Sequence, residues 1–572
     1  LEMGSNIDAR LLIIRRITMS SQTETKTRSG GQLLVRCLES LGVSHSFGVP
    51  GESYLAVLDA LHDADINFTL CRQEGAASFA SAAWGKLTGA PGICFVTRGP
   101  GATNASIGIH SAKQDSSPMI LFIGQIGTDQ RDREAFQEVD YRAFFGPIAK
   151  WATEIDDADR IPEVISHAWH IALSGRPGPV VIALPENMLT EMTDAAPCRP
   201  VKIAEAGVSH HNLAEALSLL AGAARPLVMA GGGGWTEAGK ENLRQFAEAS
   251  GLPVAAIFRY QDVMDNHSPA YIGDAGVGMA AHIRKAIKEA DVILCLNGRF
   301  GEAATGAWEL LSVPNPVQKI IHSHASDAEI GKVYQPDIAF HAGPNEMVAA
   351  LSATGLPNGN DTEREGWRTS LRADYEASLH APAQNSPVDM AAVMRHLQDV
   401  LPDDVIITHG AGNFALWPNK CFAFGAGQRL LGPQSGAMGY GLPAALAACV
   451  ACPERMVVCF AGDGDIQMGI AELGSAVQSG AKPLILVLNN GSYGTIRMHQ
   501  ERDYPGRISG TTLVNPDFTA VAQAYGMMGI KVAHTQEFAA AFKTLSEAPH
   551  GGILELDISI EAITPTKKLS EL

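Results

Sequence analysis

The two stretches MVVCFAGDGD (residues 456–465) and PLILVLNN (residues 483–490) decide the fold class of this chain. Each contains a short apolar run that predicts a buried strand, and a helical stretch separates them. A strand, a glycine-rich turn, a helix and a second strand form a parallel βαβ unit. In such a unit the GDG turn at 462–464 and the NN pair at 489–490 lie at the carboxyl edge of the sheet, where open α/β sheets bind ligands.

A second unit of the same kind lies nearer the start of the chain. The strand Ile93–Thr97 leads to a GPG turn at 99–101, then to a helical stretch, and then through Pro118 to the strand Met119–Ile123. One such unit is typical of any α/β domain. Two units with the same order of elements predict duplicated sheet domains with a site shared between them.

A third block of alternating strands and helices lies between these two units. Its predicted strands are Leu227–Ala230, Val254–Ile257, Val292–Leu296 and Lys319–His322. The chain is therefore predicted to be an α/β protein with three parallel-sheet domains. The expected domains are residues 28–190, 208–355 and 386–572, joined by linkers, and residues 1–27 are interpreted as a tag and disordered tail.

The composition excludes several classes of protein. Apolar residues make up 46% of the 572 residues, which excludes a wholly disordered chain. A net charge of −18 argues against a nucleic-acid partner. No apolar run approaches the roughly 18 residues that a membrane span requires. The nine cysteines form no disulfide framework, so we expect a reducing compartment, the cytoplasm.

Asp463 and Asn490 are candidate metal ligands. A carboxylate and an amide oxygen at one sheet edge suit a hard divalent cation, and Mg²⁺ completes its shell with phosphates and water. The glycines on both sides of Asp463 let backbone N–H groups approach a diphosphate. GDG alone is typical of a plain turn. Together with the NN pair after the next strand, it indicates a site for Mg²⁺ and a diphosphate.

This combination resembles the signature of thiamine diphosphate enzymes of the acetohydroxyacid synthase and pyruvate decarboxylase group, over about residues 28–560. The resemblance implies a pyrimidine-binding N-terminal domain, a central Rossmann-like domain and a diphosphate-binding C-terminal domain. It implies thiamine diphosphate and Mg²⁺ as cofactors, with the metal on Asp463, Asn490 and the backbone carbonyl of Ser492. The implied cofactor-binding residues are Val49, Pro50, Glu74, Gly410, Ala411, Gly412, Asn413, Gly436, Met438, Gly462, Asp463, Gly464, Asp465, Asn490, Tyr493 and Gly494.

Glu74 and Met438 have specific roles in the family that the chain resembles. A carboxylate that opens a helix, as Glu74 does, ordinarily interacts with the helix dipole. The resemblance implies instead that Glu74 is catalytic: it would bond N1′ of the aminopyrimidine and favour the imino tautomer that takes the C2 proton. Met438 lies among glycines, where a methionine usually fills a core gap. By resemblance, it would hold the cofactor in its bent shape.

Phe136-Gln137-Glu138 is similar to the FQE stretch of acetohydroxyacid synthases. The alternative interpretation of Phe136 is the start of an amphipathic helix. The resemblance implies that Phe136 and Gln137 face the substrate, and we expect Gln137 to take part in catalysis.

The chain departs from acetohydroxyacid synthases at three positions. Glu186 stands where they have a Lys, and His499 stands where they have a Trp that selects the second substrate. Glu52 replaces a small residue after a Val-Pro-Gly turn, where pyruvate decarboxylases carry an acidic residue. We treat His499 as a substrate contact and Glu52 as a hypothetical additional acid/base. These departures leave the substrate open.

The resemblance implies cleavage and formation of C–C bonds on a 2-oxo acid, by decarboxylation with carboligation as in acetolactate formation. The alternatives are a lyase or hydrolase of 2-hydroxy ketones or diketones, a 2-oxo acid decarboxylase, and a non-catalytic paralogue. A homodimer or homotetramer with sites between subunits is implied. FAD in the central domain is a further alternative, although the glycines at 231–234 fail the GxGxxG pattern.

Overall fold

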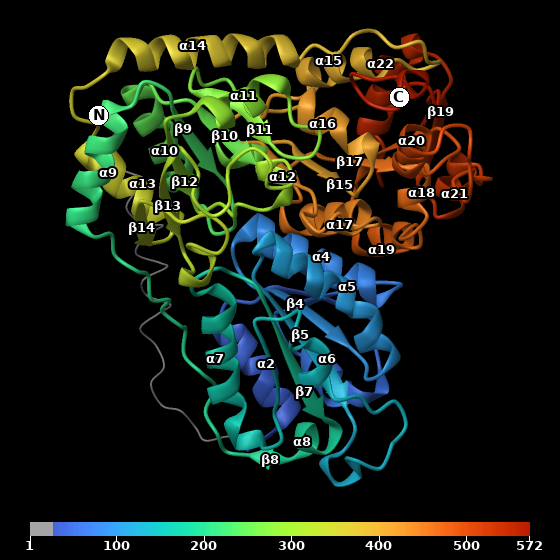
Figure 1. Ribbon diagram of the computed structural model, residues 1–572. Coiled ribbons are helices and arrows are strands. Elements are labelled where there is room, and N and C mark those ends of the chain that lie inside the picture. Colours follow the sequence, from blue (N-terminus) through green and yellow to red (C-terminus); the bar gives the residue numbers. More distant parts are fainter. Residues whose placement is uncertain (1–26) are drawn as a thin grey trace, which may run out of the picture.

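The computed structural model describes residues 27–572, so the expected tail lies outside the described residues except for Thr27. Three six-stranded parallel sheets, each covered by helices, form three α/β domains, which confirms the predicted fold class. In Figure 1 the N-terminal domain (blue to teal) lies below the central domain (green and yellow) and the C-terminal domain (orange and red). The exact domain boundaries stay predictions.

The N-terminal and C-terminal sheets have the same topology. The N-terminal strands are β2 (His45–Gly48), β3 (Asn67–Leu70), β4 (Gly92–Val96), β5 (Met119–Gln125), β6 (Trp151–Glu154) and β7 (Pro179–Pro185). The C-terminal strands are β15 (Ile406–His409), β16 (Arg429–Leu431), β17 (Val457–Gly462), β18 (Leu484–Asn489), β19 (Met528–Val532) and β20 (Gly552–Asp557). Their orders, β3-β2-β4-β5-β7-β6 and β16-β15-β17-β18-β20-β19, match strand for strand. This agreement supports the predicted duplication.

The central sheet has a different order. It consists of β9 (Pro226–Ala230), β10 (Val254–Ile257), β11 (Tyr271–Ala275), β12 (Val292–Leu296), β13 (Lys319–His324) and β14 (Ile338–His341). The strands run β11-β10-β9-β12-β13-β14, which is the order 3-2-1-4-5-6 of dinucleotide-binding folds. The central domain is therefore Rossmann-like in topology, as expected.

The N-terminal and C-terminal domains pack through small residues. Helix α4 (Glu74–Thr88) lies against α17 (Gly441–Ala451), and both helices are rich in alanine. Small side chains let two helices approach closely, and one hydrophobic cluster runs through both domains. Figure 1 shows α4 and α5 (Pro100–Asp115) facing α17 and α19 (Glu472–Ser479). This packing fixes the helix that begins with Glu74.

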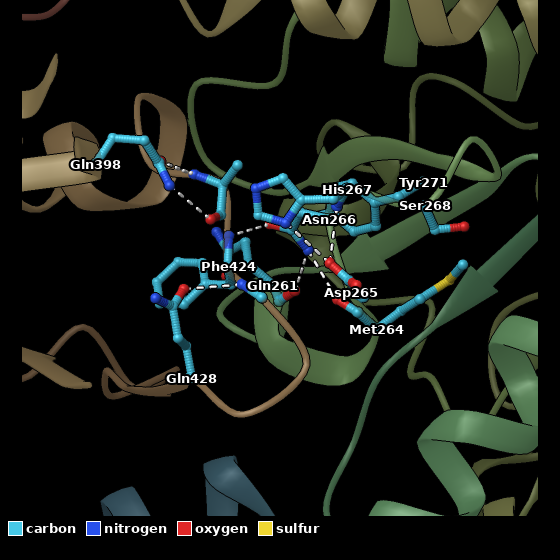
Figure 2. Close-up of polar contacts among 12 residues, drawn as sticks. Gln261, Met264, Asp265, Asn266, His267, Ser268, Tyr271, Gln398, Phe424 and Gln428 are labelled. Atoms are coloured by element: carbon cyan, nitrogen blue, oxygen red, sulfur yellow. Dashed lines mark hydrogen bonds and ion pairs between the residues drawn. The ribbon is translucent and has the colours of Figure 1, made fainter. Parts of the chain in front are cut away.

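A polar contact joins the central and C-terminal domains (Figure 2). The main-chain N–H of Asn266 donates to the carbonyl of Phe424 (2.8 Å), and the N–H of Phe424 donates back to Asn266 Oδ1 (3.0 Å). Asn266 Nδ2 is held by the carbonyls of Gln261 and Met264, each at 2.8 Å. Because Asn266 is buried, this satisfied network fixes one domain against the other.

The second expected linker contains a long helix. Helix α14 (Asp361–Ser378) runs across the top of Figure 1 from the central to the C-terminal domain. It buries Leu371 and Tyr375 against the central domain and anchors Arg364 on the carbonyls of Ala221 and Ser250. The sequence predicts only a linker here and not this helix. Within residues 27–572, no helix is long and apolar enough to cross a membrane.

Candidate active site

A cavity of about 240 Å³ opens at the carboxyl edge of the C-terminal sheet. It is formed by the loops that follow β15, β16, β17 and β18, as expected for a ligand site in an open α/β sheet. The predicted residues that line it are Ala411, Gly412, Asn413, Gly436, Met438, Gly462, Asp463, Gly464, Asp465, Asn490, Ser492, Tyr493 and Gly494. We call it the GDG cavity. Gly410, also predicted, directly precedes Ala411 in the sequence but does not line the cavity.

Asp463 carries a buried carboxylate at the floor of the GDG cavity. It is 2% exposed, and burial raises the pKa of its carboxyl group. Asn515 donates to Asp463 Oδ2 (2.6 Å), and the main-chain N–H groups of Gly464 and Ser492 act in the opposite direction to burial. No salt bridge within residues 27–572 reaches this carboxylate. A divalent cation would supply the missing positive charge.

The loop after β18 brings Asn490 and Ser492 beside Asp463. Asn490 Oδ1 accepts from the N–H of Ser492 (3.1 Å), and Ser492 Oγ donates to the carbonyl of Thr511 (2.9 Å). A Cβ on Gly464 would stand 2.4 Å from the ring of Tyr493, so only glycine fits there. A carboxylate, an amide oxygen and a main-chain carbonyl are donor types suited to Mg²⁺ with a diphosphate, and Asp463, Asn490 and Ser492 carry these groups among the residues that line the cavity.

Asp465 connects two loops beside the GDG cavity. Its Oδ1 accepts from the N–H groups of Ala411 (3.2 Å) and Gly439 (3.0 Å). The side chain is buried, and burial raises its pKa to about 7. A Cβ on Gly410 would lie 2.1 Å from the same oxygen, which explains the glycine at 410. Asp465 thus positions the loops that line the GDG cavity.

A second hydrogen-bond pair fixes the loop after β15. Thr495 Oγ1 accepts from the N–H of Asn413 (2.8 Å) and donates to Asn413 Oδ1 (3.1 Å). Thr495 begins the first turn of α20 (Gly494–Asp503) and lines the GDG cavity. His499 lies one turn further along α20, half-buried, and is outside that lining.

Glu74 lies at the carboxyl edge of the N-terminal sheet. It is the first residue of α4, and its Oε2 accepts from Asn104 Nδ2 (2.9 Å). The main chain before it is held from the C-terminal domain, because Glu472 Oε1 accepts from the N–H of Arg72 (3.0 Å). Glu472 is fully buried, and burial raises its pKa. Two residues therefore position Glu74, and neither was predicted from the sequence to do so.

The other predicted N-terminal residues share this edge. The carbonyl of Val49 accepts from the hydroxyl of Tyr54 (2.6 Å), and Pro50 is exposed. Phe136 is 73% exposed, and Gln137 has a φ of +66°, which packs its Cβ against Gly99. The residues that line the GDG cavity all lie between 411 and 563. Within one chain, the predicted site residues are thus divided between the carboxyl edge of the N-terminal sheet and that of the C-terminal sheet.

Glu52 is paired rather than free. Its Oε1 lies 3.3 Å from Arg98 Nη2, and Arg98 Nη1 lies 3.0 Å from Glu186 Oε2. Arg98 follows β4 and precedes the GPG turn. Both glutamates were singled out from the sequence as departures from acetohydroxyacid synthases, but their shared ion pairing with Arg98 was not predicted.

Family models match all three domains. The N-terminal TPP (thiamine pyrophosphate) binding domain of thiamine pyrophosphate enzymes matches residues 28–144, the central domain matches 213–351 and the C-terminal TPP binding domain matches 410–556. The chain belongs to the thiamine pyrophosphate enzyme family. Thiamine pyrophosphate is thiamine diphosphate, so the resemblance inferred from the GDG and NN motifs is confirmed at family level.

The relatives of this thiamine pyrophosphate enzyme include acetolactate synthases. It is 32% identical to the acetolactate synthase large subunit of Parasynechococcus marenigrum, over 89% of this chain and 84% of the relative. It is 29% identical to the acetolactate synthase isozyme 2 large subunit of Escherichia coli, over 95% and 99%. The Lactococcus lactis large subunit is 31% identical, over 91% of each. The similarity extends through all three domains.

Proposed function

We propose that this thiamine pyrophosphate enzyme decarboxylates a 2-oxo acid and joins the remaining acyl unit to a carbonyl acceptor. The observation that carries the proposal is that Asp463, Asn490 and Ser492, which carry oxygen donors suited to Mg²⁺, line the GDG cavity together. Similarity to acetolactate synthase large subunits over most of the chain supports this reaction class.

The GDG cavity fits thiamine diphosphate with Mg²⁺. The buried Asp463 has no cationic partner among the described residues, and its neighbours Gly462 and Gly464 line the same cavity. Asp463, Asn490 and the carbonyl of Ser492 would hold the metal, and Met438 would support the cofactor from the side. When bound, thiamine diphosphate supplies a carbon nucleophile that also stores the electron pair released by decarboxylation.

Glu74 is proposed as the proton-transferring residue. Asn104 occupies its Oε2, which leaves Oε1 for N1′ of the pyrimidine. Gln137 and Phe136 would contact the substrate, and Glu52 stays a candidate acid/base next to them. Because Arg98 pairs with Glu52, any proton transfer by Glu52 would have to disrupt or bypass that pair.

We further propose that two copies of the chain complete each site. Glu74 and the GDG cavity lie on different edges of one chain, and the cavity is lined by C-terminal residues. Large apolar side chains are exposed at both edges, which is typical of surfaces that become buried by association. They are Leu55, Phe136, Met468, Ile496 and Val514. A homodimer is the smallest assembly of this kind, and a homotetramer is two such dimers.

The glycine loop of the central domain is held by contacts with neighbouring segments. A Cβ on Gly233 would stand 2.1 Å from the carbonyl oxygen of Ser116, and Asn297 Nδ2 donates to the Gly233 carbonyl (2.8 Å). Arg299 donates to the carbonyl of Gln114 and to Gln434 Oε1, both at 2.6 Å. These contacts cover one side of the glycine loop, while the same loop also lines a cavity of about 540 Å³. FAD therefore stays an alternative, and the flavin absorbance of purified protein tests it.

All nine cysteines are free thiols, which supports the proposed cytoplasmic location.

Cofactor-dependent release of CO₂ from pyruvate tests the proposed function. Release with a carboligation product supports it, and release with only an aldehyde product would favour a simple decarboxylase. Cleavage of a 2-hydroxy ketone or diketone without CO₂ release would favour the lyase or hydrolase alternative. Binding of thiamine diphosphate without turnover on any of these substrates would favour a non-catalytic paralogue.

A further inference from the structure

A buried arginine lies between two exposed carboxylates at the carboxyl edge of the N-terminal sheet. The Arg98 side chain is 9% exposed, whereas those of Glu52 and Glu186 are 68% and 41% exposed. We call these three residues the Arg98 cluster. It contains two negative charges for one positive charge, and the negative charges face solvent.

The Arg98 cluster lies beside the residues proposed to meet substrate. Arg98 Nε donates to the carbonyl of Phe136 (3.2 Å). In the first turn of α5, three residues after Arg98, a Cβ on Gly101 would lie 2.9 Å from Thr97 and 3.5 Å from Glu74 Oε1. Arg98 and Glu74 therefore both lie near the turn that follows β4.

Arg98 is already bonded to protein groups through Nε, Nη1 and Nη2. A free guanidinium would bind a ligand carboxylate through two parallel N–H groups. Here Nη1 donates to Glu186, Nη2 donates to Glu52 and Nε donates to a main-chain carbonyl. An incoming molecule meets the exposed carboxylates, so repulsion weakens the binding of every anion, the 2-oxo acid donor included, and between two acceptors it favours the uncharged one.

We propose that the Arg98 cluster selects an uncharged aldehyde or ketone, rather than a second 2-oxo acid anion, as the acceptor. This inference rests on the proposed function and specifies its second substrate. The C1–C2 bond of the donor breaks, CO₂ leaves, and the electron pair left on C2 forms the new bond to the acceptor carbonyl carbon. The acceptor oxygen takes a proton, and the product is a 2-hydroxy ketone without net oxidation.

Competition between two acceptors of similar size tests the inference. The full chain, loaded with thiamine diphosphate and Mg²⁺, is given ¹³C-labelled pyruvate as donor and equal amounts of acetaldehyde and glyoxylate. Acetaldehyde carries a methyl group on its aldehyde carbon, where glyoxylate carries a carboxylate. We expect about tenfold or greater preference for acetaldehyde. The preference should narrow as ionic strength rises from about 0.01 M to about 0.15 M, because salt screens exposed carboxylates.

Variants of the cluster identify the cause of the preference. Glu186→Gln and Glu52→Gln should each shift the product ratio toward glyoxylate by about threefold to tenfold. The ratio is measured within each enzyme, so it does not depend on total activity. The control is Glu163→Gln on α7 (Ile161–Leu173), which removes another exposed carboxylate paired with an arginine, Arg160, at 2.8 Å. It should leave the ratio unchanged.

Three results would overturn the inference. Equal or better use of glyoxylate by the unmodified enzyme would overturn it while leaving the proposed function intact. So would an unchanged ratio in both cluster variants. Absence of cofactor-dependent CO₂ release would overturn the proposed function, and the acceptor inference with it.

Discussion

Asn515 donates a hydrogen bond of 2.6 Å from its side-chain amide to Oδ2 of Asp463. The same Nδ2 donates to Asn489 Oδ1 (2.9 Å), so one amide orients the carboxylate proposed to bind Mg²⁺ and a residue of the NN pair. Groups that orient metal ligands typically change metal affinity by about 10- to 100-fold. We expect Asn515→Leu, similar in size but unable to donate, to weaken Mg²⁺ binding within that range.

Titration of thiamine diphosphate binding with Mg²⁺, followed by calorimetry, measures this effect independently of turnover. The matched control is Asn212→Leu, which removes an amide that donates to the carbonyl of Ala339 in the central domain (3.3 Å). The control should bind Mg²⁺ normally. Unchanged affinity in Asn515→Leu would show that Asp463 needs no support from Asn515.

Glu74→Gln should separate cofactor binding from catalysis. Glutamine keeps the size of the side chain and an oxygen for Asn104, but it cannot exchange the proton expected at N1′. We expect CO₂ release to fall by about 10²- to 10⁴-fold, while thiamine diphosphate binds within a few-fold of normal. Asn104→Ala should cause a smaller loss, because Asn104 only positions Glu74. Substantial activity in Glu74→Gln would contradict its catalytic role.

In the central sheet the inner strands could be predicted from the sequence, and the outer strands could not. The four predicted strands of that domain became its four inner strands, and the predicted strands beside the GDG and NN motifs became the inner strands β17 and β18, whereas β7, an inner strand of the N-terminal sheet, was not predicted. The missed strands β11, β14, β16 and β19 lie at the edges of the central and C-terminal sheets. β14 alternates buried and exposed residues, and β19 is mostly half-buried. Inner strands, covered on both faces, are continuous apolar runs, whereas edge strands give a weaker signal.

The same distinction applies to the site. The loops after β17 and β18 that line the GDG cavity directly follow inner strands, so the GDG and NN motifs identified them, and the loop after the edge strand β16 also contributes. Asn515, Glu472 and Arg98 reach their partners from distant segments, 52 residues in the case of Asn515 and Asp463. A lone Asn or Arg in a sequence has no pattern that names its partner. These contacts could be found only in three dimensions.

Asp465→Ala should loosen the GDG cavity. The substitution leaves the N–H groups of the half-buried Ala411 and the buried Gly439 without their acceptor, at a cost of about 1–3 kcal/mol for each group that stays buried and unsatisfied. We expect a lower unfolding temperature and weaker thiamine diphosphate binding. Asp465→Asn retains an acceptor oxygen and should lose less of both. Equal losses in the two variants would show that charge, rather than hydrogen-bond acceptance, is what Asp465 provides.

His409 should make the protein less stable in acid. Burial lowers the pKa of this histidine from 6.5 to about 3, and its ring lies between the Gly410 carbonyl (2.7 Å) and Asn419 Oδ1 (3.1 Å). Below about pH 6.5 the unfolded chain binds a proton that the folded chain excludes. The stabilising contribution is therefore complete above that pH, and it declines as the pH falls toward 3, by up to about 1.4 kcal/mol per pH unit.

Urea unfolding between about pH 7 and pH 5 measures this dependence as the change in the free energy of unfolding. His409→Gln should make the dependence shallower, even if it lowers stability at pH 7. Some dependence should remain, because burial also lowers the pKa of His324, to about 4. His210→Gln, at an exposed position that begins α9 (His210–Gly222), is the control and should keep the original slope. An unchanged slope in His409→Gln would mean that His409 gains a proton in the folded protein nearly as readily as in the unfolded chain.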